Sequence, residues 1–591
     1  MIKMSNQDKT LQTVSIALIV VAVLLSLVSY NAIGGIKQQV ADLETLSTSI
    51  SGDVGTLASS IDALSAAIEE LSDRPVPTPS ITPAPAPAPS PATADEDKVV
   101  LRIGYNSAPR DFDPPHYGND FLNGIDQLVH EPLFRMWWGP SGEIIFKPII
   151  AESYEQVDEL TWDFKIREGL KFSDGTELDI QDVYWSLSRD DPRPGNMIWS
   201  LDARIESYEI IDDWTIRMVT KVPMNNLFAW LCQGWTNIVS YDWVVETDNI
   251  NNYPMVGIPP GTGPWKWYDI EPMVYAKMDL NPHWRGNKPR IDEIEIYAAV
   301  DDTARVMAFE AGSFDFIFPT PIEAVESLED AGYKLWIKPT PIMQQIQMNS
   351  AYPPTDDIRV RKAITHAINR EELVPVIWGK YASVIDSPAP VGTSGYKSHK
   401  VYDYDPAKAK ALLADAGYAD GLKVDFYVTS GREKHLEAAT AIKTYLADVG
   451  ITANLILAEK AAMNALTRGA RADYLEGKTP EFQFHLNFRG WHADTLWAGD
   501  DLFSLYYSEQ SNNRWYNENP ELDALLDLAI STAPYAERVT ASEEAQVIWM
   551  ENAYGVMLYA APYIYTTVPE LENIYTEPNV YVWFADSYFE D

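Results

Sequence analysis

The chain has 591 residues, which is too many for a single hydrophobic core, so we expect several domains. A hydrophobic fraction of 46% and a charged fraction of 22% are typical of a globular protein and exclude a largely disordered one. The 86 acidic residues outnumber the 45 basic residues, and no run of Lys and Arg occurs, which excludes a nucleic-acid-binding protein. The formal net charge of −41 favours solubility of an exposed protein.

The first predicted element is a membrane-spanning helix over residues 10–35, which follows a short cytoplasmic tip, residues 1–9. No charged residue occurs in residues 10–35, and a spanning helix needs roughly 20 apolar residues. Lys3 and Lys9 precede this segment, which favours a cytoplasmic N-terminus. A cleaved signal peptide is the alternative, but the apolar stretch is long and no clear small-residue cleavage pattern follows it. The sequence therefore predicts a single-pass anchor in the cell membrane with the main body on the extracellular side.

A heptad pattern continues over residues 36–72. Its two sets of positions are Ile36, Leu43, Ile50, Leu57, Leu64 and Leu71, and Val40, Ser47, Val54, Ile61 and Ile68. Only Ser47 is polar, and this spacing predicts a coiled-coil stalk. We expect a homodimer or a homotrimer. The alternative is a lone amphipathic helix on lipid or on the main body, although its polar face has almost no Lys or Arg to attract anionic lipid.

Residues 73–96 form a linker rich in Pro and Ala. Eight prolines alternate with other residues between Pro75 and Pro91. Alternating proline prevents helix and sheet and favours extended polyproline II, which spans ~3.1 Å per residue. The sequence therefore predicts a membrane anchor (residues 10–35), an oligomeric rod (residues 36–72) and a semi-stiff spacer (residues 73–96), which together hold a main body away from a membrane.

The main body begins at residue 97 with a strand-like run, residues 99–105. Strand and helix signals then alternate to the end, and helices are predicted over residues 357–374, 406–416 and 436–448. This alternation indicates a mixed α/β class. The single cysteine, Cys232, is expected to be a buried apolar residue.

No catalytic or cofactor-binding signature is present. The sequence has no phosphate-binding loop that ends in Gly-Lys-Ser/Thr, no His-Glu-x-x-His and no Gly-x-Ser-x-Gly. The segment 261–264 (GTGP) lacks a third glycine, and its proline blocks the helix start of a dinucleotide site. The eight histidines are scattered without an i, i+4 pair. We therefore expect a protein that is not an enzyme, with no cofactor and no metal site.

An ordered set of sequence phrases spans residues 98–591. They include VHEPLF at 129–134, TWDFKIREGLKFSDG at 161–175, GTGPW at 261–265, NPHWRG at 281–286, AGSFD at 311–315, AINR at 367–370 and LLADAGY at 412–418. In this order and spacing the chain resembles the family 5 extracellular solute-binding proteins, which include dipeptide, oligopeptide and nickel receptors of ABC importers.

The resemblance implies a two-lobed fold of the periplasmic-binding-protein kind, type II, in its large three-subdomain form. Lobe I would comprise residues 97–337 with residues 555–591 returning to it, and lobe II would comprise residues 338–554. The lobes would close on a peptide, and an ABC permease with its ATPase subunits would take the closed form as its partner.

The resemblance also implies where the ligand binds. In the peptide-binding members a strand pairs with the peptide backbone, and an aspartate after that strand holds the α-ammonium group. Asp494 falls at the position of that aspartate, although the residues that follow it depart from the common pattern. The other candidates are Gly490 for close backbone approach, Trp491 for stacking, Arg489 for a terminal carboxylate, and Tyr117, Gly118 and Asn119 as the strand of the first lobe. A loop-capping or hinge role remains the alternative for Asp494.

Other ligands and another functional class stay open. The wealth of tryptophan, including Trp137, Trp138 and Trp497, suits an oligosaccharide, because indole rings stack on sugar faces. Nickel is less favoured, since His116 and His492 are too few and too far apart in sequence. The predicted stalk also fits a non-transporting surface-structural protein built on the same fold.

Overall fold

The computed structural model describes residues 98–590. The exceptions are residues 108–112, 117–119, 142, 190–197, 199–200, 202–203, 225, 250–256, 339, 341, 431–433, 494, 511 and 532. The predicted membrane anchor, coiled-coil stalk and Pro-rich linker lie outside these residues. No helix in the described part of the chain is both long enough and apolar enough to cross a membrane.

The first lobe is built on a seven-stranded sheet. Its strands, in spatial order, are β12 (Lys334–Lys338), β19 (Tyr563–Thr567), β11 (Phe316–Phe318), β1 (Val100–Tyr105), β10 (Glu293–Ala298), β9 (Tyr275–Leu280) and β8 (Trp265–Glu271). The predicted strand at residues 99–105 is confirmed as β1, which pairs in parallel with β10 and β11. Around this sheet lie η1 (Pro114–His116), α3 (Asp120–Asp126), α8 (Asp302–Glu310), η3 (Ile322–Ala324) and α9 (Val325–Asp330). Buried side chains of β1, such as Leu101 and Ile103, place this strand in the core.

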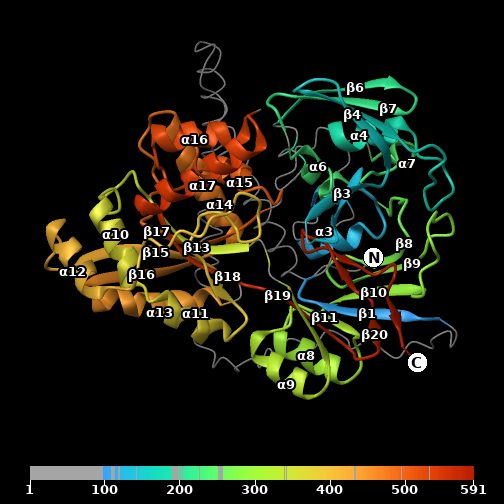
Figure 1. Ribbon diagram of the computed structural model, residues 1–591. Coiled ribbons are helices and arrows are strands. Elements are labelled where there is room, and N and C mark those ends of the chain that lie inside the picture. Colours follow the sequence, from blue (N-terminus) through green and yellow to red (C-terminus); the bar gives the residue numbers. More distant parts are fainter. Residues whose placement is uncertain are drawn as a thin grey trace, which may run out of the picture. The chain divides into compact units, whose positions relative to one another are not determined.

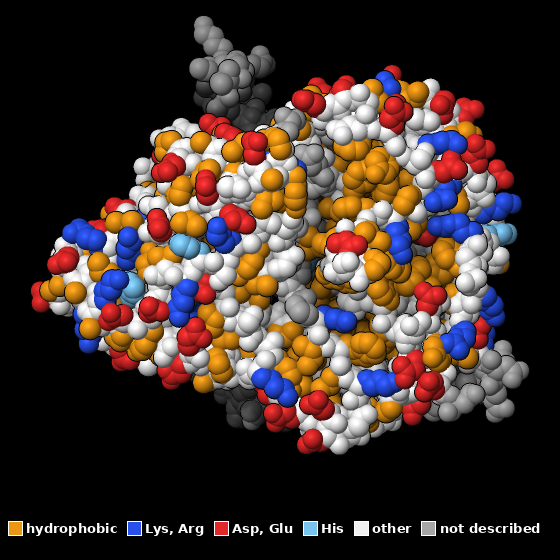
Figure 2. Space-filling model, viewed as in Figure 1, with side chains coloured by type: hydrophobic (Ala, Val, Ile, Leu, Met, Phe, Trp, Pro, Cys, Tyr) orange, Lys and Arg blue, Asp and Glu red, His pale blue; other side chains and the backbone are white. Residues whose placement is uncertain are grey.

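A second, four-stranded sheet belongs to the same lobe. Its order is β4 (Ala151–Gln156), β5 (Thr161–Ile166), β7 (Thr215–Thr220) and β6 (Ile205–Asp212). Its neighbours are the hairpin β2 (Phe134–Trp138)–β3 (Ile144–Pro148), and α4 (Ile180–Ser188), α6 (Leu227–Trp230), η2 (Gly234–Thr236) and α7 (Tyr241–Glu246). Cys232 is fully buried in this core, as expected. Figure 2 shows hydrophobic side chains gathered on the surface over α3, β3 and α6, with acidic and basic side chains interspersed elsewhere on that face.

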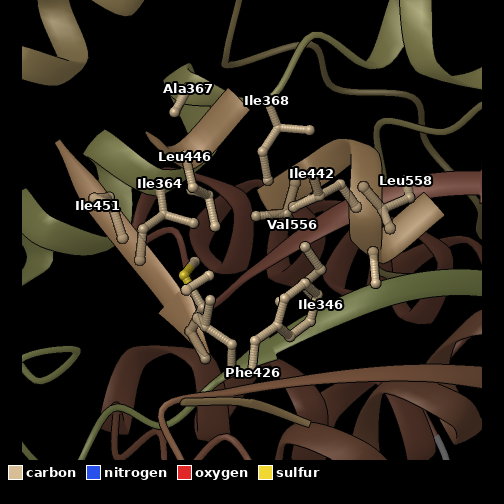
Figure 3. Packing of buried hydrophobic residues seen from close by; sticks show 14 of the residues in the cluster. Ile346, Ile364, Ala367, Ile368, Phe426, Ile442, Leu446, Ile451, Val556 and Leu558 are labelled. Atoms are coloured by element: carbon tan, nitrogen blue, oxygen red, sulfur yellow. The ribbon is translucent and has the colours of Figure 1, made fainter. Parts of the chain in front are cut away.

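The second lobe is built on a six-stranded sheet. Its order is β14 (Ser383–Val384), β18 (Gly555–Ala560), β13 (Ile342–Met348), β17 (Leu486–His492), β15 (Leu422–Thr429) and β16 (Ile451–Ala458). One face packs against α10 (Ile358–Ala367), α11 (Arg370–Trp378), α12 (Pro406–Asp415) and α13 (His435–Asp448). Figure 3 shows this core, where Ile346, Phe426 and Val556 of the sheet meet Ile364 and Ile442 of the helices.

The other face of the six-stranded sheet packs against helices from later in the chain (Figure 1). They are α14 (Lys460–Leu475), α15 (Ala498–Tyr506), α16 (Pro520–Ile530) and α17 (Tyr535–Glu551). Successive strand residues point to opposite faces. Met343 and Trp491 therefore pack on this side, whereas Ile346 and Phe488 pack on the opposite one.

The chain passes between the two lobes twice. It leaves the seven-stranded sheet after β12, enters the six-stranded sheet at β13, and returns from β18 to β19. The sequence predicts that residues 555–591 return to the first lobe, whereas the strand β18, Gly555–Ala560, hydrogen-bonds within the six-stranded sheet. The C-terminal segment ends in the short pairs β20 (Leu571–Glu572)–β23 (Tyr588–Phe589) and β21 (Tyr575–Thr576)–β22 (Val582–Trp583).

The helix predictions hold in two cases of three. The helices at residues 406–416 and 436–448 are confirmed as α12 and α13. The single helix over residues 357–374 is wrong, because the segment forms α10 and α11. Ile368 adopts an extended backbone, and Asn369 caps α11 by accepting a hydrogen bond from the N–H of Glu372. A capping asparagine begins a new helix, so the earlier one must end before it.

Candidate ligand-binding site

The strand β17 has one paired edge and one partly open edge. It pairs with β13 over its whole length, from Leu486 to His492. On its other side β15 pairs only with the first three residues of β17, ending at Phe488. Within the described residues, the half of β17 from Arg489 to His492 therefore has no strand neighbour on the β15 side.

The hydrogen-bond alternation of the β13–β17 ladder decides which backbone groups face this open edge. The N–H of Asn349 donates to the carbonyl oxygen of His485 at 3.1 Å, which makes this antiparallel pair a hydrogen-bonded one. Hydrogen-bonded and non-hydrogen-bonded pairs alternate along such a ladder. Arg489 and Trp491 consequently bond to β13, whereas Gly490 and His492 direct their backbone N–H and C=O groups away from it.

Gly490 is fitted closely to its neighbours. A Cβ atom at this position would stand 2.7 Å from Oε1 of Gln344, the residue opposite it in β13. That oxygen is hydrogen-bonded to Nε2 of His435 at 2.9 Å. The His435 ring stacks on the Phe488 ring, with 4.1 Å between the ring centres. Glycine at position 490 therefore leaves room for the Gln344 side chain beside the open edge.

Trp491 and Arg489 point to the α14–α17 face. The indole Nε1 of Trp491 donates to Oδ1 of Asp501 at 3.1 Å, and its ring packs against the core on that face. The guanidinium of Arg489 lies 5.5 Å from the centre of the Trp491 ring. These contacts hold both side chains on one face of the sheet, away from the backbone edge at Gly490.

The segment after β17 reaches the first lobe. Asp494 itself lies outside the described residues, and so do Tyr117, Gly118 and Asn119. Leu496, two residues beyond Asp494, packs into the core beside the four-stranded sheet of the first lobe. Nearby, Oδ1 of Asp500 lies 3.5 Å from Nη2 of Arg204, whose guanidinium is 4.5 Å above the Trp230 ring. The end of β17 therefore leads directly into contacts between the two lobes.

Sequence reasoning missed several of these residues. Gln344, His435, Asp500 and a buried arginine, Arg514, carried no sequence signal of their own, because isolated polar residues of these types occur throughout the chain. Their roles follow only from the sheet register and from burial. These residues could have been found from the sequence only if the order of the strands in the six-stranded sheet had been known.

The clusters of charged residues elsewhere have structural roles. In the first lobe Arg189 pairs with Asp113, and Nη1 of Arg285 lies 2.5 Å from Oε2 of Glu131, with both carboxylates buried. An open cavity of about 390 Å³ beside the four-stranded sheet is lined by Glu152, Lys165 and Arg285, but Glu152 and Lys165 already pair at 2.7 Å. The described residues contain no group of His, Cys, Asp or Glu arranged to hold a metal ion.

A family model described as bacterial extracellular solute-binding proteins, family 5 Middle, matches residues 146–513, more than half of the chain. The chain belongs to this family. Its members are the solute-binding subunits of ABC importers, so this family 5 protein binds a solute and is not an enzyme.

Curated relatives support the same assignment. The family 5 protein is 30% identical over 467 residues to the glutathione-binding protein GsiB of Escherichia coli (strain K12), with 77% of this chain and 88% of GsiB covered. GsiB of Escherichia coli O1:K1 / APEC is 29% identical over the same shares of both chains.

Solved structures show the same fold. The periplasmic binding protein DppA of Helicobacter pylori, in complex with the peptide STSA, has a TM-score of 0.71 at 22% identity and covers 82% of this chain and 98% of its own. NikA of Brucella suis, in complex with Fe(III)-EDTA, has a TM-score of 0.71 at 21% identity, with 83% and 100% covered. AppA of Bacillus subtilis, in complex with a nonapeptide, has a TM-score of 0.69 at 21% identity, with 84% and 100% covered. The mixed α/β, periplasmic-binding-protein-like fold expected from the sequence is confirmed.

Proposed function

We propose that this family 5 protein captures peptides between its two lobes and delivers them to the permease of an ABC importer. The observation that carries the proposal is the open edge of β17, where Gly490 directs its backbone N–H and C=O groups away from β13. An extended peptide can add to such an edge as a further strand, because its own N–H and C=O groups match those of the sheet. Backbone pairing of this kind accepts many side chains, as a peptide importer requires.

Asp494 is the proposed anchor of the peptide amine. It follows the open edge by two residues, between the buried residues Ala493 and Thr495. A carboxylate that binds an ammonium group contributes about 1.5–3 kcal/mol through a charge-assisted hydrogen bond. Tyr117, Gly118 and Asn119 are the proposed contacts from the first lobe.

The names of related proteins support peptide as the ligand class. The curated relatives are glutathione-binding proteins, and glutathione is a small peptide. Two proteins of the same fold were solved with the peptide STSA and with a nonapeptide. A peptide backbone is common to these three ligands, and the β17 edge offers groups that pair with a backbone.

Closure of the lobes is the proposed signal to the permease. Peptide contacts at β17 and at residues 117–119 would join the lobes, and the contacts of Leu496 and Asp500 with the first lobe would form in the closed state. A ligand shifts a two-state equilibrium by its difference in affinity for the two states. The closed, loaded form is then the partner of the permease and its ATPases.

The proposed location is the extracellular side of the cell membrane. Residues 10–35 would anchor the protein, residues 36–72 would join two or three copies, and residues 73–96 would extend the binding body outward. The mass of the detergent-solubilised full chain tests this arrangement. A dimeric or trimeric mass is expected, and a strictly monomeric mass would remove the stalk from the proposal.

Isothermal titration calorimetry on the purified full chain tests the ligand. The probes are alanine peptides of two to five residues, the same peptides with an acetylated amine, xylo-oligosaccharides and Ni²⁺. We expect binding of free peptides, a loss of at least tenfold on acetylation, and a similar loss for Asp494→Asn. The matched control is Asp403→Asn, which removes an exposed carboxylate with the same change of charge. Binding of xylo-oligosaccharides or Ni²⁺ without binding of any peptide would overturn the proposal.

A further inference from the structure

Arg514 is a buried cation whose hydrogen-bonding capacity is largely unused. It lies between α15 and α16, and only 1% of its surface is exposed. Its Nη1 donates to Oδ1 of Asn464 at 3.1 Å, whereas Nε and Nη2 are buried without a hydrogen-bond partner. Nε–H and Nη2–H lie on the same side of a guanidinium and form a parallel fork that matches the two oxygens of one carboxylate.

The charges around Arg514 are positive. Burial, and then the charges of Arg489 and Arg468, lower the pKa of Arg514 to about 8. None of the groups that shift this pKa in the described residues is a carboxylate. Arginine keeps its proton in proteins, and a buried charge without a counter-charge is strongly unfavourable. The electrostatics of this site therefore favour an anion.

One carboxylate does lie on the same face of the sheet, but it is engaged elsewhere. Asp501 accepts the indole N–H of Trp491 at 3.1 Å, and no ion pair joins it to Arg514 among the described residues. Arg514 donates its hydrogen bond to the neutral amide of Asn464. The unused fork of Arg514 consequently has no internal anion to bind in this part of the chain.

Other polar groups on this side of the second lobe are also unsatisfied. Buried atoms without a hydrogen-bond partner are Nε2 of Gln347, Oδ1 of Asn487, Oδ1 of Asn513 and Oδ1 of Asn517. Buried polar atoms are normally satisfied by protein, ordered water or ligand. Asn513 precedes Arg514 in the chain, and Gln347 and Asn487 lie opposite each other in the β13–β17 ladder, so water or a ligand can satisfy these atoms.

The register of β17 connects this region to the proposed peptide edge. Arg489 lies opposite Gln345 in the ladder and shares the α14–α17 face with Trp491. A peptide strand added to the open edge of β17 would direct alternate side chains to each face of the sheet. Every second side chain of the peptide would then lie on the face that carries Arg489, whose charge already acts on Arg514.

We propose that Arg514, with Arg489 beside it, forms a carboxylate-binding subsite that makes this protein prefer acidic peptides. The subsite binds the carboxylate side on, through Nε and Nη2 of Arg514. The preference for acidic peptides rests on the proposed peptide function, whereas carboxylate binding at Arg514 does not.

Matched peptides provide the test. The full chain is titrated with tetra-alanine peptides that carry Gln or Glu at each position in turn, so that each pair differs only in a carboxylate. The variants are Arg514→Met, which removes the charge at similar volume, and Lys443→Met, which removes an exposed positive charge on α13. We expect the best Glu peptide to bind at least tenfold tighter than its Gln partner to the wild type and to Lys443→Met. In Arg514→Met the ratio should fall to about one.

Thermal melting without peptide separates this inference from the peptide proposal. Acetate should raise the melting temperature of the wild type above its value in chloride at equal ionic strength, and this difference should vanish in Arg514→Met. If no peptide binds but the acetate effect depends on Arg514, the subsite takes free carboxylates and only the peptide function fails. Without acetate, Arg514→Met should melt at or above the wild-type temperature, because an uncompensated charge is removed. Two outcomes would overturn the subsite. One is an equal ratio of Glu-peptide to Gln-peptide affinity in the wild type and in Arg514→Met, together with no effect of acetate on melting. The other is a large loss of stability in Arg514→Met both with and without acetate.

Discussion

Gly490 lies opposite Gln344 in the β13–β17 ladder, and a methyl group on Gly490 would stand 2.7 Å from the Gln344 amide oxygen. Gly490→Ala should therefore displace Gln344 from His435 and leave buried polar groups unpaired. We expect a loss of about 1–3 kcal/mol in the free energy of unfolding, measured by urea denaturation. Gly469→Ala is the control, because this helical glycine has open space around it and alanine should stabilise α14 by about 0.5–1 kcal/mol. Equal effects of the two substitutions would contradict the fit described at Gly490.

The buried carboxyl group of Glu577 should make stability depend on pH. Oε1 of Glu577 lies 3.8 Å from Nη1 of Arg135, but burial outweighs their attraction and raises the pKa of Glu577 from 4.5 to about 7. A raised pKa means that the folded state holds the proton more tightly than the unfolded state. The contribution of Glu577 to the free energy of unfolding is fully present below about pH 4.5 and is lost as the pH rises through about 7.

Glu577→Gln tests this dependence, since glutamine resembles the protonated acid. Between pH 4.5 and 7 the wild type should lose up to roughly 3 kcal/mol more stability than the variant. Thermal melting followed by circular dichroism across this range measures the difference. Glu537→Gln, at an exposed position on α17, should keep the wild-type profile. Parallel profiles for wild type and Glu577→Gln would show that the buried acid does not titrate in this range.

Asp500→Asn should weaken lobe closure. The substitution removes the negative charge of the ion pair between Asp500 and Arg204. The side chain of Asp500 is 13% exposed and that of Arg204 is 22% exposed. The hydroxyl group of Thr495, which donates to Asp500, keeps a polar neighbour in the variant. A partly shielded pair of this kind contributes about 1 kcal/mol, which corresponds to about a fivefold loss of ligand affinity. Small-angle scattering of the unliganded chain should show a larger radius of gyration than the wild type. Asp403→Asn, an equal charge change within the second lobe, should leave both quantities unchanged.

Ile346→Ala should destabilise the second lobe. Ile346 is fully buried in the centre of the six-stranded sheet (Figure 3). Truncation leaves a cavity among side chains that cannot collapse, and the expected loss is about 3 kcal/mol in urea denaturation. Leu457→Ala on β16, the edge strand of the same sheet, removes a side chain that is 55% exposed and should cost less than about 0.5 kcal/mol. A small effect at Ile346 would mean that the core repacks around the gap.

Local sequence patterns predicted those helices and strands in which neighbouring residues favour the same secondary structure. The strand β1 and the helices α12 and α13 follow from apolar periodicity, because each buries one continuous face. The prediction failed at Ile368 and Asn369, where one apolar pattern runs through two helices. There a single capping side chain outweighed the periodicity.

The candidate site could be predicted only in part. The sequence led to Gly490 and to the strand that carries it, because their spacing resembles that of the family. It gave no indication that Trp491 would bind Asp501, or that Gln344 would occupy the space beside Gly490. Those partners lie 10 and 146 positions away in the chain, and their proximity depends on strand order and helix packing.

By itself, the sequence determined the α/β class, the family and the absence of a catalytic motif, since these depend on residue types in a fixed order along the chain. Only the tertiary structure decided which half of β17 has an open edge, which face Arg489 and Trp491 share, and that Arg514 is buried without a counter-charge among the described residues. The reason is physical. Sheet register, burial and electrostatic environment arise from contacts between segments that are distant in sequence, and no local pattern encodes them.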